Sequence, residues 1–222
     1  MIDLAQKLLV AETFCSIQGE STHAGRPCFF IRLAGCNLKC SYCDTVYAQE
    51  TAAGSERTLA QIIQEAAQSG INLVEITGGE PACQPGSVDL TAALLERNFE
   101  VLMETNGSVK LDKFPKQLKR IIDVKLPSSG MAQYNETANY DILHAGDELK
   151  FVTGSYEDFV WALDWIRQWD LDGKNVPLIF SAVFGAVELP DLVQWVLDAG
   201  LKNGRFQLQM HKFIWDPAAR GV

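Results

Sequence analysis

The segment Cys36-Asn37-Leu38-Lys39-Cys40-Ser41-Tyr42-Cys43 carries the most specific signal in this 222-residue chain. Its three cysteines are separated by spacers of three and two residues and belong to one short loop. Three thiolates in one loop can ligate three irons of a [4Fe–4S] cluster, and the fourth iron is then open to a small molecule. Gly35, just before the loop, favours the turns that such a loop needs. The segment therefore predicts an iron–sulfur centre.

Spacing alone leaves two other interpretations of these cysteines open. A structural zinc site prefers four tetrahedral ligands, usually in two pairs, and the second pair is missing here. A fourth zinc ligand would have to be a distant cysteine or histidine that the fold brings back. A redox pair formed by Cys40 and Cys43 would leave Cys36 without a role.

Composition and charge predict a single folded domain that spans residues 1–222. Apolar residues make up 47% of the chain and charged residues 21%, as in ordinary globular proteins. The 19 Lys and Arg residues against 28 Asp and Glu residues give a net charge of −9, which argues against a nucleic-acid partner. The most apolar stretch, residues 176–187, is too short to span a membrane, and the N-terminus does not resemble a signal peptide. We therefore expect a cytoplasmic protein with reduced cysteines and no membrane partner.

The hydrophobic pattern alternates between strands and helices. Helical periodicity covers residues 59–68, 90–96, 159–169 and 189–197, and an early strand is expected at 9–14. Later strands end near residues 77, 104, 124, 152, 181 and 209, a spacing typical of repeated βα units with a parallel sheet. Six or seven such units are too few for a closed eight-stranded barrel. The pattern predicts an α/β fold with a partial (βα)6-type open barrel, although a doubly wound sheet would give the same pattern.

Polar and glycine residues gather where the expected strands end. Thr77-Gly78-Gly79-Glu80-Pro81 follows one strand and Glu104-Thr105-Asn106-Gly107 another, while Asp123, Lys125 and Ser181 lie at the ends of later ones. Ligand sites of parallel α/β folds lie at the carboxyl ends of the strands. These groups are therefore expected to line one shared cleft.

The three-cysteine segment, with an aromatic residue before its last cysteine, and the later Gly78-Gly79-Glu80-Pro81 resemble the radical S-adenosylmethionine (radical SAM) superfamily. Further segments resemble the 7-carboxy-7-deazaguanine synthase family. They are Ser16-Ile17-Gln18-Gly19-Glu20, Phe29 to Cys36, Cys43-Asp44-Thr45 and Gln207 to Trp215. The resemblance covers residues 12–45, 74–81, 104–107, 123–125 and 207–215. It implies a radical SAM core with a cluster loop at 34–47 and a C-terminal tail at 207–222.

The resemblance implies a reaction and its cofactors. The family converts 6-carboxy-5,6,7,8-tetrahydropterin to 7-carboxy-7-deazaguanine with loss of ammonia, a step in deazapurine (queuosine precursor) biosynthesis. A [4Fe–4S] cluster and S-adenosylmethionine generate a 5′-deoxyadenosyl radical, and Mg²⁺ is used as well. The protein supplies orientation and shielding for this cofactor chemistry. A homodimer and an external electron donor of the flavodoxin or ferredoxin type are also implied.

The same resemblance assigns roles to individual positions, each of which could also be an ordinary strand-end or turn residue. Many members carry Ser-Pro-Lys where this chain has Asp123-Val124-Lys125. An arginine can hold a carboxylate through a two-pronged hydrogen bond, and a glutamine offers both a donor and an acceptor. The implied ligands are Cys36, Cys40 and Cys43 for the cluster, Thr45 for Mg²⁺, Gly78, Gly79, Glu80, Glu104, Asn106, Asp123, Val124, Lys125 and Ser181 for S-adenosylmethionine, and Ile17, Gln18, Gly19, Arg32, Thr77 and Val222 for the substrate.

Two other functions compete with this one. Another radical SAM enzyme, such as a glycyl-radical activase, would share the cysteines and the Gly-Gly-Glu motif but would not need Arg32 or Thr45. A zinc- or cluster-stabilised binding module would be no enzyme at all. Several residues are expected to be structural: Glu20 and His23 as loop surface, Cys15, Cys28 and Cys83 as buried apolar residues, and Trp161, Trp165 and Trp169 as a packing stripe or dimer face.

Overall fold

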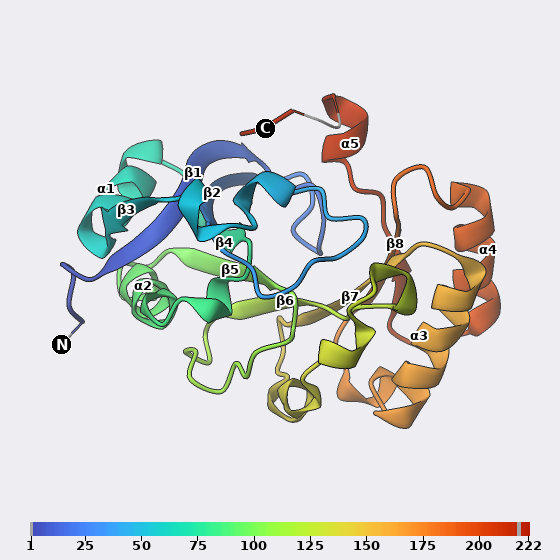
Figure 1. Cartoon of the computed structure of the whole chain (residues 1–222). Coiled ribbons are helices and arrows are strands. Elements are labelled where there is room, and N and C mark those ends of the chain that lie inside the picture. The colour runs from blue at the N-terminus through green and yellow to red at the C-terminus, as the bar shows by residue number, and fades with distance from the viewer. Residues whose placement is uncertain (1, 217–218) are drawn as a thin grey trace.

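The computed structural model describes residues 2–216 and 219–222, and these form one nine-stranded sheet in the order β3-β1-β2-β4-β5-β6-β7-β8-β9 (Figure 1). Strands β2 and β4 to β9 are parallel, whereas β1 runs antiparallel to both β2 and β3. The predicted α/β fold with an open, mostly parallel sheet is confirmed. The strands are β1 (Lys7–Ile17), β2 (Pro27–Leu33), β3 (Ser55–Thr58), β4 (Leu73–Gly78), β5 (Glu100–Thr105), β6 (Lys119–Asp123), β7 (Glu148–Thr153), β8 (Leu178–Ala182) and β9 (Gly204–Phe206).

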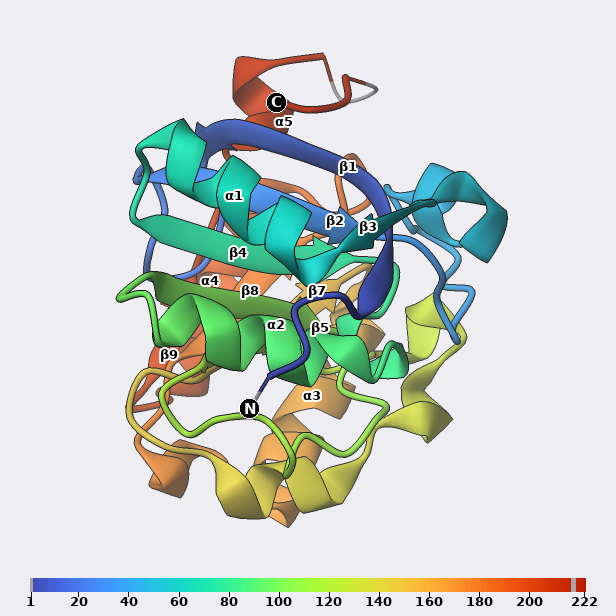
Figure 2. The ribbon, with the colours of Figure 1, turned by 90° about the vertical axis from the view of Figure 1, so that its left-hand side faces the viewer.

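Helices cover the outer side of the curved sheet. They are α1 (Leu59–Ser69), α2 (Gly86–Leu95), α3 (Tyr156–Gln168) and α4 (Leu189–Ala199), whereas the short α5 (His211–Ile214) belongs to the C-terminal segment that follows β9. Helix α1 packs on β1 to β3, α2 on β1 and β5, α3 on β7, and α4 on β8 and β9. Figure 2 shows α1 and α2 in front of the first strands and α5 beyond β1. The inner side of the sheet is therefore left to loops and to the C-terminal segment.

Local sequence explains where α1 begins and why α2 is longer than predicted. Thr58 caps α1 by accepting a hydrogen bond from the Gln61 backbone, and the Gln61 side chain caps the Thr58 backbone in return. Helix α2 begins at Gly86 rather than at residue 90. Pro85 and Gly86 are residues typical of a turn rather than of a helix interior. Gly86 lies close to the N-terminal segment, since a Cβ at this position would come within 3.1 Å of Gln6 and Leu8 atoms. The first turn of α2 therefore packs close to β1.

The two faces of β2 contribute to two different cores. Phe29, Ile31 and Leu33 belong to the large core under the helices. Cys28 and Phe30 face the inner side, in a small cluster with Leu73, Leu102 and Ile121. Alternation along the strand places Arg32 on this inner face, as the sequence predicts. The inner side is thus apolar in its lower part and polar toward the carboxyl ends of the strands.

The differences from the predicted elements have physical reasons. Strand β9 ends at Phe206 instead of residue 209: the Gln207 N–H still donates to the Phe180 carbonyl of β8 (2.9 Å), and the Gln207 side chain donates from Nε2 to the Ser21 carbonyl (2.7 Å), so the chain leaves the sheet after this residue. The tryptophans of α3 pack against the core: Trp161 and Trp165 stack with centroids 4.7 Å apart. The packing interpretation of this stripe is confirmed, and a dimer face remains a prediction. None of the described helices is both long and apolar enough to cross a membrane.

Candidate active site

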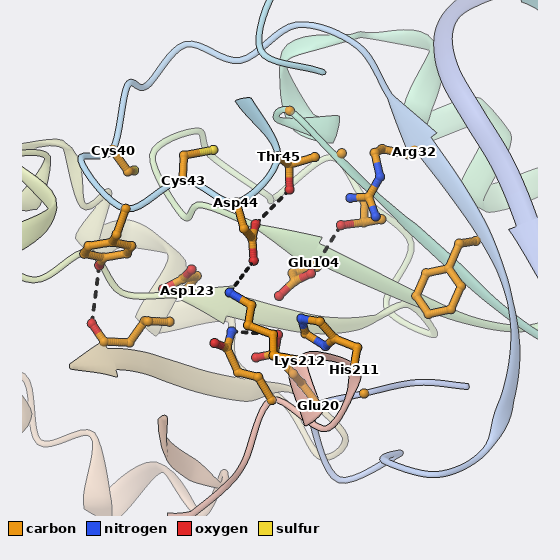
Figure 3. A pocket seen from close by; sticks show the side chains of 18 of the residues that line it. Glu20, Arg32, Cys40, Cys43, Asp44, Thr45, Glu104, Asp123, His211 and Lys212 are labelled. Carbon is orange, nitrogen blue, oxygen red and sulfur yellow. Dashed lines mark hydrogen bonds and ion pairs between the residues drawn. The ribbon is translucent and has the colours of Figure 1, made fainter. Parts of the chain in front are cut away.

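A cavity of about 550 Å³ opens on the inner side of the sheet (Figure 3). Its wall is built by the cluster loop, by the carboxyl ends of β2, β4, β5 and β6, and by the C-terminal segment. The structure brings most of the predicted site residues together here: Ile17, Gln18, Gly19, Arg32, Cys36, Cys40, Cys43, Thr45, Thr77, Gly78, Gly79, Glu104, Asn106, Asp123, Lys125 and Val222 line the cavity.

The three predicted cluster cysteines are half-buried on one wall of this cavity. The sulfur of Cys36 accepts hydrogen bonds from the Leu38 backbone (3.4 Å) and from Asn106 Nδ2 (3.7 Å). Burial raises the pKa of the Cys40 thiol, while the nearby Lys125 ammonium lowers it. N–H donors and a cation stabilise thiolates, so this donor set fits an iron–sulfur cluster. Among residues 2–216 and 219–222, no three His, Cys, Asp or Glu side chains are grouped to hold a single metal ion.

Backbone hydrogen bonds hold the cluster loop against neighbouring segments. The Cys36 N–H donates to the Gln49 carbonyl (2.8 Å), and the Ser41 N–H donates to the Ser129 carbonyl (3.1 Å). The Tyr42 hydroxyl donates to the Val152 carbonyl at the end of β7 (3.3 Å). These contacts hold the backbone of the cluster loop in place at the cavity wall.

Gly78 and Gly79 are required by a close approach of two backbones. A Cβ at Gly78 would lie 2.2 Å from the Leu33 oxygen, and one at Gly79 would lie 2.1 Å from the Gly35 oxygen. Gly78 also has φ of +128°, which residues with a side chain rarely adopt. The two glycines therefore let the end of β4 lie directly against the cluster loop.

Three residues predicted to bind S-adenosylmethionine lie outside the cavity wall. Glu80 is fully buried and accepts hydrogen bonds from Thr105 Oγ1 (2.7 Å) and the Asn106 backbone (2.7 Å), which joins two strand-end loops. Val124 is buried and donates its N–H to the Lys150 carbonyl (2.8 Å). Ser181 is buried within β8. These three residues therefore lie behind the cavity wall rather than on it.

Arg32 reaches the cavity from β2. Its Nε donates to Glu12 Oε1 (2.8 Å), and Tyr47 donates its hydroxyl proton to the same oxygen (2.5 Å). Figure 3 shows the guanidinium directed into the cavity. A guanidinium fixed through one edge presents its remaining donors to a planar acceptor such as a carboxylate.

Residues 18–26, between β1 and β2, fold under the cavity, and we call them the floor loop. Thr22 donates its backbone N–H to Glu148 of β7 (3.0 Å), and Arg26 pairs with Glu100 of β5 (2.5 Å). The prediction that Glu20 and His23 lie at the surface is wrong, because the loop crosses the strands instead of extending into solvent. Their side chains are 12% and 11% exposed, and Glu20 lines the cavity.

Lys150 is a site residue that was not predicted from the sequence. It is buried in β7, and its ammonium lies between the carboxylates of Glu20 (3.0 Å) and Glu104, which also accepts a hydrogen bond from Thr77 (3.2 Å). Burial opposes the charge of Lys150, but the two carboxylates raise its pKa well above the ordinary value. The feature of the sequence that could have indicated this role is a single lysine between two apolar strand residues, Leu149 and Phe151, which are both buried in the structure.

The C-terminal segment closes the cavity over the floor loop and the cluster loop. The Met210 N–H donates to the Gly19 carbonyl (3.0 Å), and Lys212 pairs with Asp44 (2.9 Å). Asp44 in turn accepts a hydrogen bond from the Thr45 hydroxyl (2.8 Å), which Figure 3 shows beside the cysteines. Residues 217 and 218 of the predicted tail lie outside the described residues.

Two further expectations for cysteines are corrected. Cys28 is buried as expected, but Cys15 and Cys83 are exposed. Cys15 lies in β1 on the face opposite to that of its neighbours Phe14 and Ser16, and its side chain is exposed. Cys83 is the last residue of the short helical turn Pro81–Cys83. Neither lines the cavity.

Comparison of the sequence with known proteins assigns the chain to a class of enzymes. The family model of the radical SAM superfamily matches residues 30–180, so the chain is a radical SAM protein. Its sequence is 43% identical to the 7-carboxy-7-deazaguanine synthase of Chlorobaculum tepidum, over 97% of each chain. It is 38% identical to the enzyme of that name from Clostridium acetobutylicum, over 96% of this chain and 98% of the relative. The chain belongs to the 7-carboxy-7-deazaguanine synthase family, and the glycyl-radical activase alternative is not favoured.

The fold agrees with this assignment. The crystal structure of QueE from Escherichia coli is similar to this structure with a TM-score of 0.75 and 23% sequence identity, covering 92% of this chain and 95% of the other. The chain is therefore an enzyme of the radical SAM class, and the predicted iron–sulfur cluster and S-adenosylmethionine are the cofactors of that class.

Proposed function

We propose that this enzyme converts 6-carboxy-5,6,7,8-tetrahydropterin to 7-carboxy-7-deazaguanine with loss of ammonia, a lyase step in queuosine precursor biosynthesis. One observation carries the proposal: a single cavity joins the three cysteines to a fixed guanidinium and to a pair of carboxylates held by the buried Lys150. A carboxylated pterin needs both of these polar partners. The family's relatives named for this activity support the same reaction.

The cofactor side of the cavity is formed by the cluster loop and the ends of β4 to β6. When bound, the cluster and S-adenosylmethionine would supply the radical chemistry that acts at C6 of the substrate. Cys36, Cys40 and Cys43 would hold the cluster. The open backbone at Gly78 and Gly79 and the polar side chains at the ends of β5 and β6, Glu104, Asn106, Asp123 and Lys125, would hold S-adenosylmethionine.

The substrate side lies between β2 and the floor loop. Arg32 would bind the carboxylate of the pterin through its guanidinium donors. The carboxylate of Glu20, and that of Glu104 at the boundary with the cofactor side, would accept hydrogen bonds from the N–H groups of the aminopyrimidinone ring. Ile17, Gly19 and Thr77 would border the ring system, and Val222 lies at the cavity wall as well. The protein groups thus orient C6 and keep water away from the radical.

Magnesium, a partner subunit and a reductant complete the proposal. The Thr45 hydroxyl is a hard oxygen donor that suits Mg²⁺, and because its proton is donated to Asp44, its lone pairs are left to bind the ion. We also propose a homodimer, an electron donor of the flavodoxin or ferredoxin type, and a cytoplasmic location. These points rest on the family resemblance.

Replacing Arg32 with alanine tests the substrate side alone. A charge-assisted hydrogen bond contributes about 1.5–3 kcal/mol, so we expect the KM for the pterin to rise about 10- to 100-fold. S-adenosylmethionine affinity should stay unchanged, because Arg32 lies across the cavity from Cys40 and Cys43 (Figure 3). Isothermal titration of each ligand separately measures both effects. An Arg32→Ala variant with unchanged pterin affinity would contradict the carboxylate role.

A further inference from the structure

A third carboxyl group lies below the cavity without lining it. Glu75 of β4 is 1% exposed and faces the inner side, between Leu73 and Thr77 on the same face of the strand. Its neighbours in the adjacent strands are Phe30 of β2 and Leu102 of β5, which both belong to the inner apolar cluster. Burying an ionised carboxylate in such apolar surroundings costs free energy, so the group must be neutral or must have a polar partner.

Glu75 is connected to the substrate-binding segment through Gln18. Gln18 Nε2 donates a hydrogen bond to Glu75 Oε2, and Gln18 Oε1 accepts one from the Glu20 N–H (2.5 Å). Gln18 is itself 4% exposed. Both ends of this side chain are therefore engaged with the protein, and they fix the backbone from residue 18 to residue 20. If Gln18 contacts the substrate as predicted, it does so through its backbone groups or through the second N–H of its side-chain amide.

The charges around Glu75 favour its neutral form. The ionisable groups facing it are Glu20 from the floor loop, Glu104 from β5, Lys150 from β7 and the Cys28 thiol from β2. Lys150 already lies between Glu20 and Glu104, so these three groups carry one net negative charge. A charged Glu75 would add a second one. Burial, followed by the Glu104 carboxylate, raises the pKa of Glu75 to about 8.

We propose that Glu75 is a positioning residue that, as the neutral carboxylic acid, holds Gln18 and thereby the Gly19–Glu20 backbone in the conformation that binds substrate. This inference rests on the proposed function. Ionisation of Glu75 places a further negative charge beside Glu20 and Glu104, where it competes for Lys150 and repels an anionic substrate. The enzyme therefore loses pterin affinity at high pH, with no direct contact between Glu75 and the pterin.

Variants of Glu75 test the proposal through the pH dependence of KM. Wild-type KM should rise above pH 8, by up to about tenfold per pH unit. Glu75→Gln keeps a neutral acceptor for Gln18, so its KM should match the wild type at pH 7 and stay flat to pH 9. Glu75→Leu removes the acceptor and should raise KM at every pH. The matched control is Glu148→Gln, which also replaces a buried carboxyl that holds the floor loop but should keep the rise above pH 8.

Thermal unfolding gives a second readout that does not depend on activity. Between the ordinary pKa of 4.5 and the raised value of about 8, folded Glu75 retains a proton that unfolded Glu75 has lost. Its contribution to stability therefore declines as pH rises through this window. The Tm of Glu75→Gln should exceed that of the wild type increasingly from pH 5 to pH 8. A Tm difference that is constant with pH, or a Glu75→Gln variant that keeps the rise of KM above pH 8, would overturn the proposal. A wild type that forms no deazaguanine would refute the proposed function instead.

Discussion

Cys40→Ala abolishes cleavage of S-adenosylmethionine, because the cluster loses one of its three protein ligands. Cys40 lies on the cavity wall, next to the Lys125 ammonium that favours its thiolate. Without this thiolate one iron has no protein ligand, and a cubane held by Cys36 and Cys43 alone is released or degraded. The measurement is the amount of 5′-deoxyadenosine formed after anaerobic reconstitution with iron and sulfide. We expect none, together with loss of the brown absorbance.

Cys15→Ala is the matched control. Cys15 is an exposed free cysteine of β1 that does not line the cavity, so its removal should leave the iron content and cofactor cleavage unchanged. Residual 5′-deoxyadenosine from Cys40→Ala at the level of this control would contradict the cluster assignment.

Lys150→Met has the second-largest expected effect. The substitution keeps the length of the side chain but leaves Glu20 and Glu104 without the cation between them. Breaking a buried ion pair costs about 3–5 kcal/mol. Because Glu104 retains partial exposure, we expect a loss of about 3 kcal/mol in the free energy of unfolding. We also expect kcat/KM to fall about 100-fold, since two carboxylates that face the substrate are no longer held.

Lys119→Met provides the comparison. Lys119 pairs with Glu100 at 2.5 Å, but its side chain is 33% exposed and the pair lies away from the cavity. Such a pair contributes about 1 kcal/mol or less. Urea unfolding and steady-state kinetics measure both variants. Equal losses in stability and in kcat/KM from the two substitutions would show that Lys150 has no special place in the site.

The parts of this site that depend on local sequence were predictable. The spacing of the three cysteines is a property of one loop, and period-two alternation is enough to place Arg32 on the inner face of β2. The glycines of the Gly78-Gly79 motif mark a close backbone approach, which the structure shows at the cluster loop. These features require no knowledge of the path of distant segments.

The parts that depend on long-range contacts were not predictable in the same way. The floor loop owes its path to Glu148 and Glu100 and to the C-terminal segment, which are 74 to 189 residues away along the chain. Its partners are single polar residues with no periodic pattern. The role of Lys150 could not be predicted for a related reason. A single charged residue in an apolar strand indicates a site only when its partners are known, and these partners, Glu20 and Glu104, come from distant parts of the chain.

The central claim is tested most directly by anaerobic turnover. The reconstituted enzyme is mixed with S-adenosylmethionine, a reductant, Mg²⁺ and 6-carboxy-5,6,7,8-tetrahydropterin, and the products are followed by mass spectrometry. The structure and the family predict 7-carboxy-7-deazaguanine, absent when S-adenosylmethionine is omitted and reduced when Mg²⁺ is omitted. Formation of 5′-deoxyadenosine without the deazaguanine would contradict the substrate, and an intact cluster that yields neither product would contradict the radical SAM activity itself.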